Sequence, residues 1–249
     1  MRPLGFREAA EFWGVAADPE LAFRLHALTG GTPEYKDRCG GVGPRSLADF
    51  DDWVRLRLLD PAGPMFREGG VPSSEGSPIA DPASYASVLA AISAGAERPA
   101  EIAAAIGRDV AVADLLGALA ALGLIERLQD PLNVGRSVCV IVKPIVRLHQ
   151  LVIAPNEPEL AAGQAGPVWA RSQPTVAARI YRPHFASVTR QWCLRHAGKG
   201  TLGGVARAAR PSGIGCREHQ QEHALEAVIA DRGSRPASSR KRPPGPTSS

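Results

Sequence analysis

The sequence predicts an α+β fold in which helices dominate, and three observations support this. Apolar residues recur at helical spacing over most of the first 125 residues, between residues that start helices and glycines that end them. One pair of short, β-branched segments follows, at 124–128 and 137–142. The chain has 249 residues, 44% of them hydrophobic, which is enough for one large core or two small ones.

Residues 1–60 are expected to form several short helices. Asp18-Pro19-Glu20 opens one that stops at Gly30-Gly31, because Pro suits the first turn of a helix and Gly suits its end. A later segment, 47–59, again has apolar positions at helical spacing. Residues 61–80 are rich in Pro, Gly and Ser and predict a linker or surface loop.

Residues 81–142 predict a winged helix-turn-helix. Three helices with a tight turn between the second and third precede the two strands, which pair as a hairpin around the loop 130–135. Each helix has its own start or stop signal, and these fall at Asp81-Pro82, Gly95, Pro99, Gly107 and Gly123.

The remaining residues predict a mixture of helix and strand. Ile145–Ile153 is an apolar stretch, 155–158 contains two prolines and suggests a turn, and a helix is expected from Pro183. The last stretch, 231–249, is low in complexity and is expected to be disordered.

Composition narrows the classes of protein that fit. No window is apolar and long enough for a signal peptide or a membrane span, so we expect a cytoplasmic protein with no membrane partner. Cysteines stand at 39, 139, 193 and 216, with no C-x-x-C pair and no His at ligand spacing. We therefore expect reduced thiols and no metal site. His149, His184 and His196 have no catalytic context and are expected to be surface or core residues.

An ordered series of motifs resembles a known family. The series contains Phe6–Phe12, the segment GGTPEY at 30–35, the winged helix, Pro144–Arg147, and Pro183-His184-Phe185 through Trp192. Together they resemble the archaeal-type AAA+ ATPases, over roughly residues 4–230. The motif residues in this chain are Gly30, Gly31, Pro33, Tyr35, Pro144, Arg147, Phe185 and Trp192.

The resemblance implies a division of the chain. Residues 1–60 correspond to a helical lid-like segment, 61–80 to a linker and 81–142 to the winged helix. Residues 143–230 correspond to an incomplete α/β segment of the PD-(D/E)xK nuclease class, which precedes the tail at 231–249. In the family a P-loop domain comes before the lid, and this sequence contains no G-x-x-x-x-G-K-[ST] motif.

These departures predict a protein without catalysis. Glu226 lacks the second carboxylate and the Lys that a nuclease of that class uses with its metal ion. We expect no cofactor, since ATP and Mg²⁺ belong to the intact family. The leading hypothesis is a truncated, non-catalytic remnant acting as an adaptor or weak DNA-binding protein. The alternatives are a winged-helix, transcription-factor-like DNA binder, and an ATPase or nuclease subunit completed by a P-loop-bearing partner chain.

Any DNA contact is expected to be weak and independent of sequence. The third helix of the winged helix opens at 109–114 with two acids and no Lys, Arg, Asn or Gln, which suits neither bases nor phosphates. From Thr201 onward eight Lys or Arg stand against four Asp or Glu, so the excess positive charge lies in the tail. The candidate DNA contacts are Arg98, Arg108, Arg127, Arg136, Arg240, Lys241 and Arg242.

Overall fold

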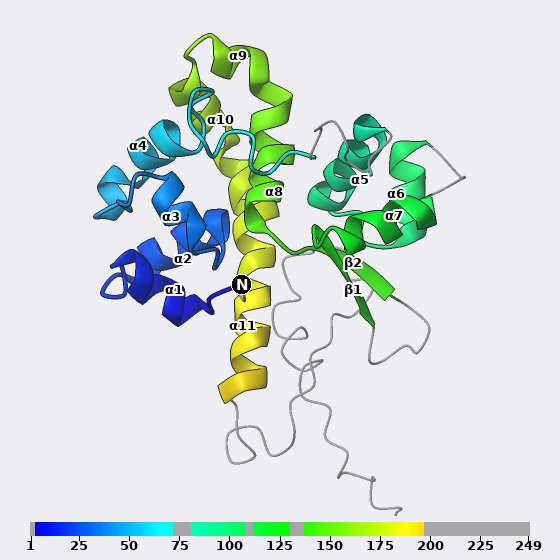
Figure 1. The fold of residues 1–249 in the computed structure, drawn as a ribbon, viewed down its shortest axis with the longest axis horizontal. Helices are drawn as coiled ribbons and strands as arrows, with labels where there is room; N and C mark the ends of the chain where they lie inside the picture. The colour runs from blue at the N-terminus through cyan, green and yellow to red at the C-terminus, as the bar shows by residue number, and fades with distance from the viewer. Residues whose placement is uncertain (1–2, 72–80, 108–111, 130–136, 197–249) are drawn as a thin grey trace, which may run out of the picture.

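The structure is a computed structural model that describes residues 3–71, 81–107, 112–129 and 137–196 (Figure 1). Over these residues the protein is mostly helical, with one antiparallel sheet of two strands. The broad α+β class expected from the sequence is therefore confirmed. None of the helices in the described part is both long and apolar enough to cross a membrane.

The first part of the chain forms four helices, α1 (Phe6–Trp13), α2 (Pro19–Thr29), α3 (Glu34–Arg38) and α4 (Leu47–Arg57). The Asp18 carboxylate starts α2 by accepting the backbone N–H groups of Glu20 and Leu21. The side chains that these helices bury against one another are Trp13, Leu21, Leu25, Leu28, Tyr35, Phe50 and Val54.

The segment after α4 is a series of turns that packs onto the core. Residues 61–71 pack onto the helices, and both Met65 and Phe66 are buried. Glu68 accepts a hydrogen bond from the Tyr35 hydroxyl at 3.0 Å and forms an ion pair with Arg38. The Pro and Gly residues of 61–71 therefore form tight turns on the surface of the core. Residues 72–80, the rest of the expected linker, lie outside the described residues.

The next three helices and the hairpin follow the predicted order. They are α5 (Pro82–Ala94), α6 (Pro99–Ile106), α7 (Val112–Ala121), β1 (Ile125–Gln129) and β2 (Ser137–Ile141). The strands are antiparallel with Arg127 opposite Cys139, and the Cys139 N–H donates to the Glu97 carbonyl at 2.7 Å. This bond ties the hairpin to the connection between α5 and α6. The loop of the hairpin, 130–136, is not among the described residues.

Residues 143–196 form helices throughout, so the expected α/β character is absent from this described part of 143–230. The elements are α8 (Pro144–Leu148), the π-helix η1 (His149–Ile153), the 3₁₀ turn η2 (Ala154–Asn156), α9 (Glu157–Ala161), α10 (Ala165–Val176), the π-helix η3 (Ala177–Tyr181) and α11 (Arg182–His196). Prolines that suggested breaks are accommodated where α-helical spacing gives way to π or 3₁₀ spacing.

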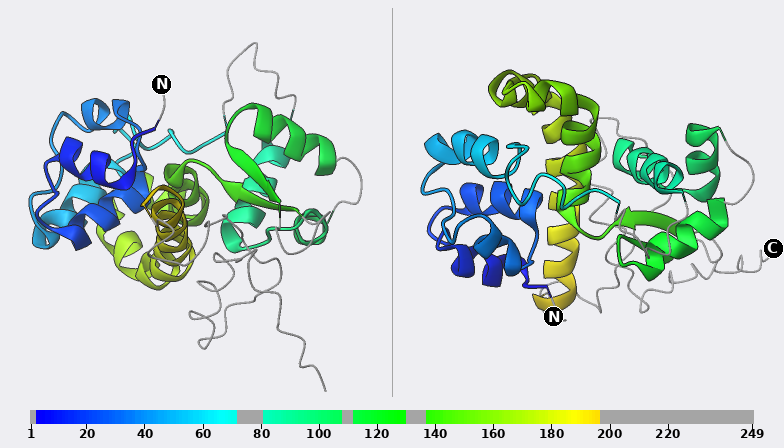
Figure 2. Two further views of the ribbon diagram at one scale, coloured as in Figure 1. Left: turned by 90° about the horizontal axis from the view of Figure 1, so that it is seen from below. Right: turned by 45° about the horizontal axis from the view of Figure 1, so that its top comes forward.

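The continuous helix α10–η3–α11 runs through the middle of the molecule (Figure 1). The helices α1–α4 lie on one side of it, and α5–α7 with the hairpin lie on the other, as both views in Figure 2 also show. The pair α8–η1 contacts both sides, since α8 packs against α2 and η1 packs against α5. One hydrophobic core therefore extends across all of these elements.

Candidate functional site at the helix junction

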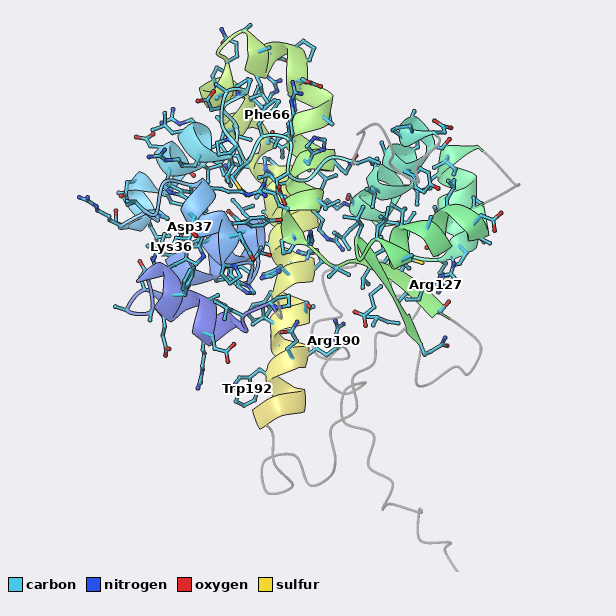
Figure 3. The ribbon with its side chains drawn as sticks, viewed as in Figure 1. Lys36, Asp37, Phe66, Arg127, Arg190 and Trp192 are labelled. Carbon is cyan, nitrogen blue, oxygen red and sulfur yellow. The ribbon has the colours of Figure 1, made fainter. Side chains whose placement is uncertain are left out.

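The candidate DNA contacts that the structure describes are engaged within the protein. Arg98 forms an ion pair with Glu101 at 3.6 Å. Arg127, which Figure 3 shows on the hairpin, donates to the Ala113 carbonyl at 3.4 Å. Arg108, Arg136, Arg240, Lys241 and Arg242 lie outside the described residues, as does the expected disordered tail.

The exposed side of α7 carries few side chains that could hydrogen-bond to the edge of a base. Its exposed residues from Val112 onward are Ala113, Asp114, Gly117 and Ala121, so small side chains surround one carboxylate. Residues 109–111, which complete the predicted start of this helix, are not described. Reading of DNA sequence through the described part of α7 is therefore chemically disfavoured.

Four motif residues of the family resemblance, by contrast, meet at one junction, and these are Gly30, Gly31, Pro144 and Arg147. Gly30 ends α2 with φ 66° and ψ −156°, a conformation reserved for glycine. A Cβ on Gly30 would lie 3.0 Å from the Cδ of Pro144, which begins α8. A Cβ on Gly31 would lie 1.9 Å from the Leu4 carbonyl oxygen, so the N-terminal segment passes directly over this glycine. The two glycines thus allow three segments to approach closely.

A pair of histidines lies at the same junction. His26 Nδ1 and His184 Nε2 are 2.8 Å apart, so one ring donates its N–H to the other. Phe6 and Phe23 pack against this pair, with Phe6 meeting the edge of His26 at 5.6 Å between ring centroids. Burial lowers the pKa of His26 to about 4 and that of His184 to about 3. Both rings are therefore neutral at neutral pH.

The junction encloses a cavity of about 300 Å³. Among its lining residues Arg147 and Arg190 carry charge, and none is Asp or Glu. A cavity with two guanidinium groups and a neutral imidazole pair favours a small anionic group. The other residues that bear on this choice are Gly30, Gly31, Ser187 and Gln191.

Arg147 also has a structural role. In a regular α-helix the Arg179 carbonyl would accept the N–H of residue 183, but Pro183 has none. The Arg147 guanidinium donates to this carbonyl at 3.4 Å. Arg147 therefore links α8 to the point where η3 becomes α11.

The remaining motif residues lie away from the cavity. Pro33 precedes α3 as its N-cap, and Tyr35 is buried with its hydroxyl on Glu68. Phe185 and Trp192 are exposed on α11. The motif GGTPEY is thus divided, with its glycines at the cavity and its tyrosine in the core.

Sequence reasoning missed the histidine pair and the second arginine. His184 has no catalytic motif around it in the sequence, but it is paired with His26, from a helix more than 150 residues earlier in the chain. Arg190 has no motif around it. Neither spacing nor composition relates α2 to α11, so only the fold could reveal this grouping.

Three of the four cysteines lie within the described residues, and Cys216 lies outside them. Cys39, Cys139 and Cys193 are unpaired and buried. Burial raises the pKa of Cys39 to about 11 and also raises that of Cys139, which keeps both protonated. Within the described residues, no three His, Cys, Asp or Glu side chains gather in a way that could hold a metal ion.

Comparison of the chain with protein-family models, with curated proteins and with solved structures finds no match in any of the three. A function for the chain is therefore inferred from its own geometry and charge.

Proposed function

We propose that this protein is a non-catalytic nucleic-acid-binding protein that holds the phosphate backbone through η3 and α11, without reading sequence. One observation carries the proposal. Over Ala165–His196, the continuous helix α10–η3–α11, the sequence contains five arginines and no Asp or Glu. Arginines that neutralise phosphates release bound counterions, which gives affinity independent of base sequence.

The arginines of this helix differ in their surroundings. Arg171 is bound by Glu159 at 2.6 Å and by Asn156 at 2.7 Å, so an acid already neutralises it. Arg179 and Arg182 are exposed, and Arg190 lines the cavity. These three span about 16 Å of helix at 1.5 Å per residue, which is long enough to follow several phosphates.

We also propose that residues 81–142 form a winged helix used for packing. The order of α5, α6, α7 and the hairpin supports the assignment. The packing role is supported by α5, which contacts α8, η1 and β2. The small and acidic face of α7 argues against a role in reading bases.

The test is an anisotropy titration of a labelled random-sequence DNA duplex at about 50 and 200 mM salt. Replacing Arg182 and Arg190 by Gln should weaken binding and lower the log–log salt slope by about 2, at roughly 0.9 per phosphate contact. The matched control replaces Arg98 and Arg127 by Gln and should leave the slope unchanged. The variant R240Q/K241Q/R242Q measures the share that belongs to the tail.

Full binding by R182Q/R190Q would show that this helix is not the nucleic-acid surface. Tight and selective binding of one genomic fragment would instead favour the transcription-factor alternative.

A second candidate function is favoured by the cavity. In the archaeal-type ATPases the lid lies near the nucleotide, and here Gly30 and Gly31 border a cavity lined by Arg147 and Arg190. We propose, as the alternative, a lid-like adaptor for a P-loop-bearing partner chain. Calorimetry with inorganic pyrophosphate tests it, because binding that R190Q abolishes would support it and absence of binding would count against it.

A further inference from the structure

The helix α11 carries two aromatic rings on its surface. Phe185 is 61% exposed and Trp192 is 43% exposed, although large aromatic side chains usually bury most of their area. Trp13, Trp53 and Trp169 are each less than 10% exposed. Trp192 therefore differs from the other tryptophans of the chain.

The two rings lie on the same side of α11. They are seven residues apart, which is close to two turns, so they are separated by about 10 Å along the helix. Trp192 and Arg190 point to opposite sides of α11 in Figure 3. The aromatic stripe, Phe185 and Trp192, is thus distinct from the cavity that Arg190 lines.

Phe185 is held in place without being covered. Its ring meets Phe23 of α2 in an edge contact, with centroids 5.9 Å apart and planes at 76°. Phe23 also contacts Tyr181 and His184, so it is itself fixed within an aromatic cluster. A ring supported from one side and exposed on the other is a preorganised stacking surface.

The charge around the stripe is favourable to an anion. Arg182 precedes Phe185 by one turn and is exposed. On the neighbouring helix α2, Glu20 is paired with Arg24 at 2.6 Å, so that its charge is balanced. Basic and aromatic side chains on one helix are what single-stranded nucleic acid requires, since its backbone needs cations and its bases need π faces.

We infer that the aromatic stripe is a base-stacking platform, and that the nucleic acid held by α11 is single-stranded. This inference rests on the proposed function and adds the class of ligand. In a duplex the bases already stack on one another, so the rings of Phe185 and Trp192 have no base face to meet. Arg182 neutralises phosphate in either case, but the aromatic stripe contributes for single strands alone.

A lipid surface is the less suitable partner. A helix that lies on a membrane needs a broad, continuous apolar face. Between the two rings Val188 and Thr189 are partly buried and Ala186 is small, so the exposed apolar area consists mainly of the two rings. Two separated rings suit two bases better than an acyl layer.

The test uses the full chain carrying R240Q/K241Q/R242Q, so that the tail does not dominate. Labelled oligo(dT) and a duplex of equal length are titrated against this parent and against F185A, W192A and R182Q. The control F12A removes another exposed ring, on α1, which is 38% exposed. Both stripe residues are exposed, so their substitutions leave the core intact.

We expect F185A and W192A each to weaken oligo(dT) binding about tenfold and to leave duplex binding within about twofold. R182Q should weaken both ligands, and F12A neither. Oligo(dT) should also quench the tryptophan fluorescence of the parent, and W192A should abolish this quenching.

Three results would overturn the inference. Equal affinity for single strands and duplexes, unchanged in F185A and W192A, would remove the stacking platform and leave the proposed function standing. Absence of binding to either nucleic acid would remove both. Binding to vesicles of phosphatidylcholine and phosphatidylserine that W192A abolishes, with oligo(dT) binding unaffected, would assign the stripe to a membrane.

Discussion

Gly69 provides a sharp test of the packing of residues 61–71. It is buried beneath the junction of α8 and η1, and a Cβ added to it would lie 2.5 Å from the Ile145 carbonyl oxygen and 2.5 Å from the His149 Cβ. Its backbone is not in the left-handed region, so the effect of Gly69→Ala is steric alone. Ordinary contacts of a Cβ begin near 3.4 Å, so one of two main-chain segments must move.

Overpacking of this kind costs about 1–3 kcal/mol, and two contacts with rigid groups place Gly69→Ala at the upper end, about 2–3 kcal/mol. For a chain of this size each kcal/mol lowers the melting temperature by about 2–4 °C, so we expect a decrease of about 4–12 °C. The free energy of unfolding is measured by urea titration with circular dichroism.

Gly117→Ala is the matched control. Gly117 lies within α7, and a Cβ there meets nothing within 4 Å. Replacement of a helical glycine by alanine should raise the free energy of unfolding by about 0.5–1 kcal/mol. Neutral surface substitutions change the free energy of unfolding by about 0.5 kcal/mol or less. If Gly69→Ala stays within that margin of the parent, residues 61–71 are a free linker and do not pack onto the core as described.

Three further predictions concern single contacts. Since His26 and His184 stay neutral when folded, the unfolded chain alone takes up protons as the pH falls toward and below 6.5. The free energy of unfolding should then decrease by about 1 kcal/mol per pH unit for each ring between pH 6.5 and 5, and His184→Gln should make urea titrations less dependent on pH. Trp169→Phe removes the indole N–H that donates to Asp51 at 2.8 Å between α10 and α4, and should lower the free energy of unfolding by about 1–2 kcal/mol. An unchanged midpoint in the urea titration would show that water replaces this hydrogen bond. Asp18→Ala removes the N-cap of α2 and should cost about 1 kcal/mol, with Asp18→Asn close to the parent; equal losses for both would point to charge instead of capping.

Where local signals agreed, the sequence predicted the fold well. The helices α2, α5 and α6 begin at a capping residue or a proline and end at Gly30, Gly95 and Gly107, which all adopt positive φ. Their caps are local, so no knowledge of the fold is needed to place them. The hairpin was predicted for the same reason, since β-branched residues and turn signals lie close together.

Prolines caused the main errors in the second half of the chain. Pro155 and Pro158 suggested a turn, and Pro183 suggested the start of a new helix, yet the chain stays helical through all of them. The π-helices η1 and η3 end shortly before Pro155 and Pro183, and this wider spacing relieves the demand for a proline N–H. Tertiary contacts stabilise such segments, as when the Arg147 guanidinium donates to the Arg179 carbonyl. Contacts of this kind cannot be predicted from a local sequence pattern.

Some residues of the candidate site were predicted from the sequence, but their grouping in space was not. The sequence selected Gly30, Pro144 and Arg147 by resemblance, and the structure brings these residues together. The arginines proposed as DNA contacts were selected by their charge and by their place beside the predicted helices, the wing and the tail. Ion pairing depends on neighbours in space, so the engagement of Arg98 and Arg127 could not be foreseen.

The buried cysteines allow local opening of the protein to be measured without any added label. Cys39 lies just after α3, Cys139 is in the hairpin and Cys193 is in α11, so each belongs to a different part of the described chain. A thiol reagent can reach such a group only when its surroundings open. Alkylation followed by peptide mapping would therefore give three separate opening rates from one sample. Those rates would show whether the helices around the junction move as one cooperative unit or come apart in sequence.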